Sequence, residues 1–321
     1  MKQTRERILT RLGLSNIPVS GDELAAELGL SRTGVWKHVE ALRKAGADIQ
    51  AQPGQGYLLK SEAFTSGMLY SRISTSCIGN KIRIMDQTGS TNRDVMQLAE
   101  QGEKEGLILF ANHQSEGKGR LGRVWHTLPA SLACSVLLRP KLPPEQVPQL
   151  SLLTAVALHD ALSQFVPEIS IKWPNDLLYK GAKLAGILTE MRAEPGSVHA
   201  VVLGFGINLN APTDGWPDTI TQPAIDLESI ACRKVTRLEI AAAVIHALEH
   251  WYNLYLEQGF TPVHRAWWSA HAASGQPVRV HDGRGYIDGI ATALDDDGAL
   301  LLDTGHQIQR IIAGDLELLS R

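Results

Sequence analysis

The sequence has few cysteines and no long apolar run, and each shortage excludes a class of protein. Its three cysteines among 321 residues, Cys77, Cys134 and Cys232, are widely separated, so neither a disulfide framework nor a zinc site is expected. No apolar stretch approaches the roughly 18 to 20 residues that span a bilayer. Residues 1–14 carry charges throughout and lack an apolar signal core. We therefore expect a cytoplasmic protein with no membrane partner.

What is present is typical of a packed protein of two or three domains. The chain is 44% hydrophobic, and its length exceeds that of one ordinary domain. The net charge is −3, but residues 1–60 hold nine Lys or Arg against six Asp or Glu, which is a local charge of +3. A basic head on an acidic body indicates that the head meets a polyanion such as DNA.

Residues 20–44 predict two short helices joined by a glycine turn. Ser20, with Glu23 three positions later, forms a capping box that starts the first helix, and Gly29 ends it. Ser31 starts the second helix. Its apolar stripe consists of Val35, Val39 and Leu42. This arrangement is typical of a helix-turn-helix motif.

The second helix presents a polar and basic surface away from its apolar stripe. We expect five of its side chains to contact DNA: Arg32, Thr33, Trp36, Lys37 and Arg43. Residues 47–59 predict two short strands around a Pro-Gly turn, which form a wing. The alternative is a winged-helix domain that contacts only proteins.

A polar cluster follows the predicted strand 81–88 and begins the predicted helix 93–100. It consists of Ser90, Thr91 and Asn92. Such residues are favoured at helix starts for local capping alone. The functional alternative is a patch whose hydroxyl and amide groups bind a small ligand.

A glycine-rich loop follows the predicted strand 107–112. Its glycines match G-x-G-x-x-G, but a strand at 131–138 follows instead of a helix, and no acidic residue stands about twenty positions on. A dinucleotide site is therefore excluded, and no standard P-loop is present. Lys118, Arg120 and Arg123 suit phosphate or carboxylate, and Trp125 could form an apolar wall. A solvated basic loop is the alternative.

Two further segments predict strands that end in polar or small residues. Lys183 starts the strand 183–190 after a hairpin turn at 180–182, and the strand 201–210 contains Gly204, Gly206 and Asn208. Several strands that end in polar or small residues predict a sheet with a ligand pocket at one edge.

Five motifs together resemble the family of bifunctional biotin–protein ligases that also repress the biotin operon. They are G-S-T-N at 89–92, the glycine-basic loop at 117–125, K-W-P-N-D at 172–176, K-L-A-G-I-L at 183–188 and G-F-G-I-N at 204–208. They occur in this order, and the resemblance covers essentially the whole chain.

The resemblance implies an α/β (α+β) protein of three domains. These are a winged helix-turn-helix at 1–62, a mixed-sheet domain similar to class II synthetases at 63–270, and an SH3-like barrel at 271–321. Residues 224–268 predict mainly helices. From Gly275 onward, short strands at 278–280, 286–293, 299–302 and 308–312 alternate with turns. The barrel has eight acids and no Lys, which disfavours it as a phosphate platform except around Arg310.

The resemblance also implies the reaction. Family members make biotinyl-5′-AMP from biotin and ATP with Mg²⁺, and then transfer biotin to one lysine of the biotin carboxyl carrier protein of acetyl-CoA carboxylase. The adenylate-bound homodimer binds operator DNA. These are the expected substrates, cofactor and partners.

Site residues are carried over by motif. The expected catalytic residues are Lys183, Arg120 and Asp176. The expected biotin-binding residues are Ser90, Thr91, Asn92, Gln114, Lys118, Gly119, Arg120 and Lys183. The expected nucleotide-binding residues are Lys118, Arg120, Arg123, Trp125, Asn175 and Asn208. No residue is expected to ligate a metal ion.

Departures from the family pattern leave alternatives open. Lys118 stands where the family loop commonly has arginine, so the two parallel hydrogen bonds that a guanidinium can donate are lost. Residues 314–321 lack a clear match to the arginine that some family members place near the nucleotide.

A pure transcription regulator that senses a small molecule is one alternative function, which the cations disfavour. Lipoate attachment is the other.

Overall fold

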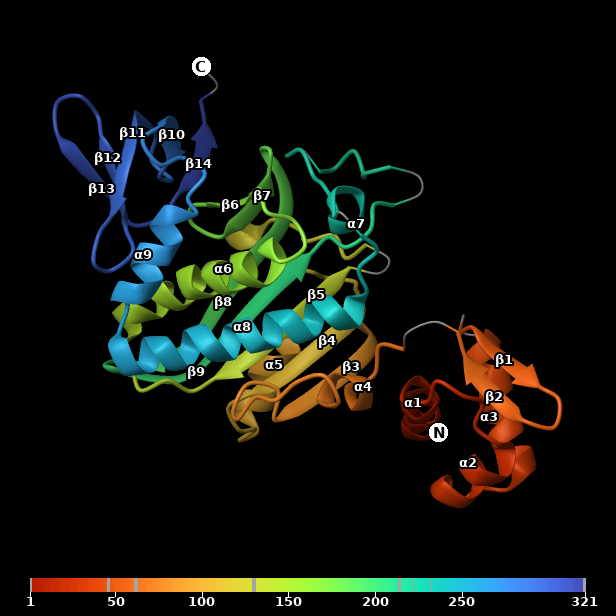
Figure 1. The fold of residues 1–321 in the computed structure, drawn as a ribbon. Helices are drawn as coiled ribbons and strands as arrows, with labels where there is room; N and C mark the ends of the chain where they lie inside the picture. The colour runs from red at the N-terminus through yellow and green to blue at the C-terminus, as the bar shows by residue number, and fades with distance from the viewer. Residues whose placement is uncertain are drawn as a thin grey trace. The chain divides into compact units, whose positions relative to one another are not determined.

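The computed structural model describes residues 2–44, 47–60, 63–128, 131–212, 215–220, 222–231 and 233–319. The chain divides into two compact units, one of residues 1–74 with 236–242 and one of residues 75–235 with 243–321 (Figure 1). Cys77 and Cys134 carry thiols, of which the second is buried, and the third cysteine, Cys232, lies outside the described residues.

The first unit is the predicted winged helix-turn-helix. Its elements are α1 (Lys2–Gly13), α2 (Gly21–Leu28), α3 (Arg32–Lys44), β1 (Ile49–Gln52), β2 (Gly56–Leu59) and α4 (Ser66–Tyr70). Ser20 Oγ accepts a hydrogen bond of 3.0 Å from Glu23 N at the start of α2, and Gly29 ends that helix at φ 66°. Both signals had been predicted from the sequence.

The apolar stripe of α3 forms the core of this unit, as predicted. Val35, Val39 and Leu42 are buried against α1 and α2. The antiparallel strands β1 and β2 make the wing. Tyr57 of β2 packs against the core of the unit and exchanges backbone hydrogen bonds with Val19.

A seven-stranded sheet organises the second unit. Its strands are β3 (Lys81–Thr88), β4 (Leu107–Gln114), β5 (Leu132–Leu138), β6 (Ile169–Lys172), β7 (Asp176–Tyr179), β8 (Ala182–Glu194) and β9 (Ser197–Ile207). Their order is β3-β4-β5-β9-β8-β7-β6, and only β3 and β4 are parallel. The strand predicted to reach residue 210 therefore ends at Ile207, and Asn208 follows it.

Helices α5 (Thr91–Glu100) and α6 (Val147–Ser163) pack on this sheet. The helices that follow β9 are α7 (Leu227–Ile230), α8 (Arg237–Gln258) and α9 (Thr261–Ser269). Helix α5 packs on β4, β5 and β9 through Val95 and Ala99. Helix α6, for which no prediction was made from the sequence, packs on β6 to β9 and on α9 (Figure 1). It is buried almost all round, so it lacks the amphipathic period that marks a surface helix.

The last part of the chain is a small antiparallel β-domain. Its strands are β10 (Pro277–His281), β11 (Tyr286–Leu294), β12 (Leu300–Asp303), β13 (Ile308–Ile311) and β14 (Asp315–Leu318), in the order β13-β12-β11-β10-β14. The first four were predicted, and β14 was not. Among the described residues, no helix combines the length and apolarity needed to cross a membrane.

Candidate active site

A cavity of about 1220 Å³ in the second unit collects every residue predicted to bind biotin or nucleotide. Its lining comes from the end of β4, the start of α5, the glycine-basic loop (residues 117–125), strands β6 to β9 and the β-domain. The predicted residues that line it are Ser90, Thr91, Asn92, Gln114, Lys118, Gly119, Arg120, Arg123, Trp125, Asn175, Asp176, Lys183 and Asn208. Segments more than 100 residues apart in sequence therefore meet in one place.

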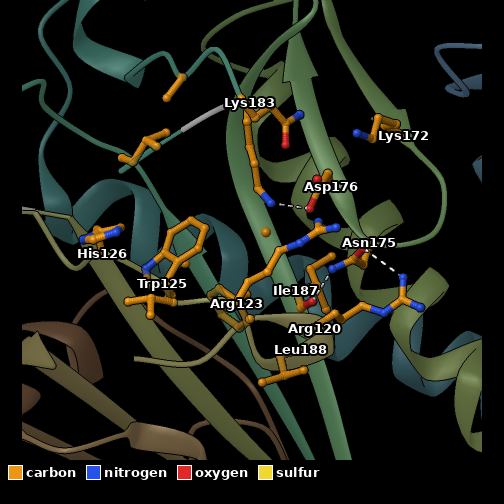
Figure 2. A pocket seen from close by; sticks show the side chains of 18 of the residues that line it. Arg120, Arg123, Trp125, His126, Lys172, Asn175, Asp176, Lys183, Ile187 and Leu188 are labelled. Carbon is orange, nitrogen blue, oxygen red and sulfur yellow. Dashed lines mark hydrogen bonds and ion pairs between the residues drawn. The ribbon is translucent and has the colours of Figure 1, made fainter. Parts of the chain in front are cut away.

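An ion pair between Lys183 and Asp176 lies in the wall of this cavity. Lys183 Nζ is 2.7 Å from Asp176 Oδ1, and the side chains are 24% and 9% exposed (Figure 2). The predicted hairpin turn joins their strands, with Lys180 and Gly181 at φ 47° and 85°. Because β7 and β8 are adjacent, the hairpin brings the two side chains together.

Two more cations of the cavity are partly removed from water. Burial lowers the pKa of Lys172, although the neighbouring charge of Asp176 opposes that shift. Burial also lowers the pKa of Arg120, against the opposing charges of Asp315 and Asp176. Poorly hydrated cations bind an anion more strongly than exposed ones do, since little water must be displaced.

The glycine-basic loop is a tight hairpin. Lys118 and Val124 form a β-bridge, and Gly119 N donates to Arg123 O at 2.7 Å. The turn places Leu121 at φ 56° and Gly122 at φ 76°. The loop is therefore ordered by its own backbone, and its basic side chains project from a defined frame.

The two arginines of this loop contact other elements. Arg120 Nη1 donates to Asn175 Oδ1 and to Gly314 O, both at 3.4 Å. Arg123 forms an ion pair with Asp315 of the β-domain. The β-domain thus touches the loop directly.

Trp125 forms the expected flat wall. Its ring packs so closely over Gly206 that a Cβ there would overlap it. Lys183 Nζ lies 5.8 Å from the ring centroid. The indole Nε1 is buried and has no hydrogen-bond partner among the described residues. Because buried donors in proteins are nearly always hydrogen-bonded, this Nε1 indicates that a bound ligand supplies the acceptor.

The residues of the polar cluster at the start of α5 differ in whether their side chains already have protein partners. Ser90 occupies the cap position but makes no side-chain cap hydrogen bond, so local capping does not explain it. Thr91 donates from N and Oγ1 to Gln114 Oε1 at 2.8 and 3.0 Å. Asn92 accepts from Ser135 Oγ at 2.6 Å and donates to the carboxylate of Glu190 at 2.7 Å. Both atoms of the Asn92 amide are thus occupied by protein.

The two asparagines after the strands are also held by backbone. Asn175 Nδ2 donates to Ile187 O at 2.7 Å, and Asn208 Nδ2 donates to Lys183 O at 3.3 Å. Each amide therefore ties one cavity segment to β8. The backbone around Lys183 is fixed in this way.

The predicted DNA-binding residues are not equivalent. Arg32, Thr33, Trp36 and Lys37 are exposed on α3. Arg43 instead donates to Ile49 O at 2.7 Å and pairs with Glu40 at 2.6 Å. Arg43 therefore ties α3 to the start of the wing.

Two parts of the cavity were not assigned from the sequence. Lys172 stands in the K-W-P-N-D motif, whose charge was the available signal, but no role was given to it. Asp315 and Gly314 lie in a segment without a recognised motif, and only the tertiary structure brings them to the loop.

Three family models match successive parts of the chain. An HTH domain matches residues 4–58, the biotin/lipoate A/B protein ligase family matches residues 84–208, and the biotin protein ligase C-terminal domain matches residues 273–319. The fold and the cavity thus define a ligase of the biotin/lipoate class that carries a helix-turn-helix.

Curated relatives specify the class further. The chain is 36% identical over 304 residues to the bifunctional ligase/repressor BirA of Bacillus subtilis, with 94% of each chain covered. It is 29% identical over 313 residues to BirA of Escherichia coli, covering 94% of this chain and 93% of that one. The protein belongs to the family of bifunctional biotin ligase/repressors.

Solved structures agree. The biotin protein ligase of Aquifex aeolicus in complex with biotin and ATP is similar with a TM-score of 0.64 and 27% identity, over 75% of this chain and 100% of that chain. The interpretation as an enzyme with a DNA-binding domain is therefore confirmed over that of a sensor without catalysis.

Proposed function

We propose that the cavity joins the carboxylate of biotin to the α-phosphate of ATP, which releases pyrophosphate. One lysine of a biotin carboxyl carrier protein then attacks the resulting biotinyl-5′-AMP, forming an amide with biotin and releasing AMP. The observation that supports this most is the ion pair of Lys183 and Asp176 beside Lys172 and Arg120. One wall thereby offers several cations to anionic reactants and one carboxylate to an amine.

The cations serve the first step. Attack of a carboxylate on a phosphate brings two anions together, and fixed positive charges offset their repulsion and the charge that develops in the transition state. We assign the contact with both groups to Lys183, and the adenylate phosphate to Arg120 with Lys118 and Arg123. Lys118 keeps the charge of the usual loop arginine without its fork.

The polar start of α5 serves biotin. The hydroxyl of Ser90, which does not cap its helix, is free to bind a polar ligand group. Thr91, Gln114 and Gly119 complete this side of the cavity. Asn92 supports it by fixing the helix start, and the indole of Trp125 covers the ligand. Asn175 and Asn208 hold the segments that border the nucleotide.

Magnesium would enter with the triphosphate of ATP. Among the described residues, no group of three His, Cys, Asp or Glu could hold a metal ion. Asp176, Asp315 and Glu317 are the described carboxylates that line the cavity, and the first two are each paired with a cation. Mg²⁺ commonly binds mainly through substrate phosphates and water, which this donor set fits.

The second step needs no covalent residue of the enzyme, because the carrier lysine is the nucleophile. We assign Asp176 to accept the proton of that amine. Its carboxylate is buried and stands within the cavity, so an entering ammonium group can exchange with Lys183 as its partner.

The repressor role uses the first unit. We propose that the adenylate-bound homodimer binds operator DNA through Arg32, Thr33, Trp36 and Lys37, with the protein acting in the cytoplasm. The proposed modules are residues 1–62, 63–270 and 271–321. A two-fold dimer suits a palindromic operator.

The test is incubation with biotin, ATP, magnesium and a purified carrier domain, followed by mass spectrometry of the carrier. Wild-type protein should add biotin, Lys183→Ala should not, and Lys180→Ala should equal wild type because Lys180 faces outward in the same hairpin. A parallel reaction with lipoate should leave the carrier unmodified. Lipoylation without biotinylation would favour the alternative ligase, and no product with either acid would refute the enzymatic proposal.

A further inference from the structure

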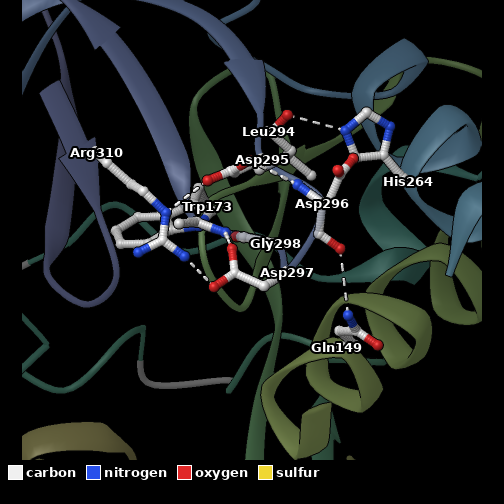
Figure 3. A network of polar contacts seen from close by, with 10 residues as sticks. Gln149, Trp173, His264, Leu294, Asp295, Asp296, Asp297, Gly298 and Arg310 are labelled. Carbon is white, nitrogen blue, oxygen red and sulfur yellow. Dashed lines mark hydrogen bonds and ion pairs between the residues drawn. The ribbon is translucent and has the colours of Figure 1, made fainter. Parts of the chain in front are cut away.

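A turn of the β-domain is held in one shape by a single arginine. The turn consists of residues 295–298 between β11 and β12, and Gly298 N donates to Asp295 O at 2.9 Å. Arg310 on β13 donates to Asp295 Oδ2 at 2.5 Å and to the carboxylate of Asp297 (Figure 3). One guanidinium therefore clamps two carboxylates of the same turn.

The backbone of this turn and of Leu294 just before it accepts hydrogen bonds from two helices. Gln149 Nε2 of α6 donates to Asp296 O at 3.3 Å, and His264 Nε2 of α9 lies 3.0 Å from Leu294 O (Figure 3). Because a carbonyl can only accept, His264 is the donor. The acceptors are backbone atoms, so their direction depends on the conformation of the turn.

The third donor is Trp173, which belongs to the wall of the cavity. Its indole Nε1 donates to Gly298 O at 3.4 Å, and its side chain is 1% exposed. Gly298 has φ 92°, and a Cβ at this position would lie 2.5 Å from Leu152 Cδ1. The turn therefore meets α6 and Trp173 through backbone that tolerates no side chain.

Trp173 stands between the reactive residues of the K-W-P-N-D segment. Lys172 precedes it, Asn175 and Asp176 follow it, and these three side chains line the cavity. Lys172 and Asp176 are also register partners across β6 and β7. A displacement of the buried indole would therefore move the backbone that presents them.

We propose that Arg310 is a positioning residue of the reaction site. It holds the turn 295–298, the turn holds the indole of Trp173, and Trp173 sets the position of Lys172 and Asp176 in the cavity. Arg310 does not line the cavity and touches no reactant. The β-domain thereby takes part in ordering the wall of the active site.

Hydrogen exchange tests the structural part without any substrate. Arg310→Ala should accelerate amide exchange in the segment 169–179, because its anchor is loosened. The matched control is Asp288→Asn, which breaks the other double Arg–Asp contact of the β-domain, at 2.7 Å to Arg279, and should leave that segment unchanged. Unchanged exchange in Arg310→Ala would overturn the proposal, and this result does not depend on any measurement of ligation.

Steady-state kinetics test the catalytic part, which rests on the proposed function. Arg310→Ala and Trp173→Phe should each lower kcat/KM by about threefold to tenfold, a range typical of coupled neighbours. The double variant should lose no more than the larger single loss, because both changes break the same connection. The kcat/KM of Arg310→Lys should lie between those of wild type and Arg310→Ala, because a lysine can pair with only one of the two carboxylates. Multiplying losses in the double variant would show a merely structural role and overturn the proposal, whereas an inactive wild type would instead refute the proposed function.

Discussion

Arg123 of the glycine-basic loop is ion-paired with Asp315, the first residue of the last strand of the β-domain. Beside it, Arg120 donates to the backbone carbonyl of Gly314. Both loop arginines are thus directed toward β14 as well as toward the cavity. An anionic ligand must therefore compete with Asp315 for the charge of Arg123.

Asp315→Asn should strengthen ATP binding. Removing the competing carboxylate releases Arg123, and because Arg123 is 61% exposed the gain is limited to about twofold to fivefold. Isothermal titration of ATP into the protein measures it, with Asp288→Asn as the control. Weaker binding in Asp315→Asn would show instead that Asp315 holds the loop in its binding shape.

Lys172, which had no assigned role at the sequence level, should prove necessary for adenylation. Lys172→Met should lower kcat for biotinyl-adenylate formation by about tenfold to a hundredfold, since a fixed charge near the reacting phosphate is lost. Pyrophosphate release measures this step. Lys180→Met, on the exposed side of the neighbouring hairpin, should match wild type, and an active Lys172→Met would remove this residue from the site.

The lowered pKa of Lys172 also predicts a pH dependence. Since burial moves its pKa below the usual 10.5, the charged form is lost at a lower pH than for a free lysine. Adenylation should therefore decline on the alkaline side before pH reaches that value. Lys172→Arg should keep some activity and move the decline to higher pH, since arginine stays protonated. An unchanged alkaline limb would assign the decline to another group.

His271 should make the second unit less stable in mild acid. Burial lowers its pKa from 6.5 to about 4, against a backbone hydrogen bond to Ile171. The folded protein therefore keeps His271 neutral while the unfolded chain binds a proton, so stability is lost as pH falls from 6.5 toward 4. The loss can reach about 3 kcal/mol.

Urea unfolding at pH 7.5 and pH 5 measures the contribution of His271. His271→Gln should reduce the difference between the two pH values, whereas the exposed His306→Gln should not. An equal pH difference in all three proteins would show that other groups cause the acid sensitivity.

On α3, Lys37 and Arg43 should differ in what they support. Lys37→Ala should weaken DNA binding nearly uniformly across sequences and reduce the salt slope by about one, as loss of one phosphate contact does. Arg43→Ala should instead lower the melting temperature, because Arg43 binds Ile49 O and Glu40. Fluorescence anisotropy and thermal melts separate the two. If Arg43→Ala weakened DNA binding and Lys37→Ala lowered the melting temperature, Arg43 would be the DNA contact and Lys37 the structural residue.

Local sequence patterns were sufficient to predict many of the helix ends, apolar stripes and turns of this protein. The Ser20 cap, the Gly29 stop and the stripe at Val35 and Val39 each depend on neighbours within one or two turns of chain. The hairpin turn before Lys183 is equally local. The motifs that gather in the cavity were also recognisable one by one, since each is a short run of residues.

Other elements left no local signal. Helix α6 is buried on nearly every side, so no amphipathic period marked it, and β14 became a strand only by pairing with β10. The occupied amide of Asn92 and the pairing of Arg43 with the wing depend on residues that tertiary contacts bring near.

The sequence by itself determined the order of the domains, the helix-turn-helix and the set of residues that could hold a nucleotide and an acid. Only the tertiary structure decided that Arg123 meets Asp315 and that Trp173 meets Gly298. The physical reason is distance along the chain. These partners are separated by 192 and 125 positions, and no periodicity or capping preference relates residues that far apart.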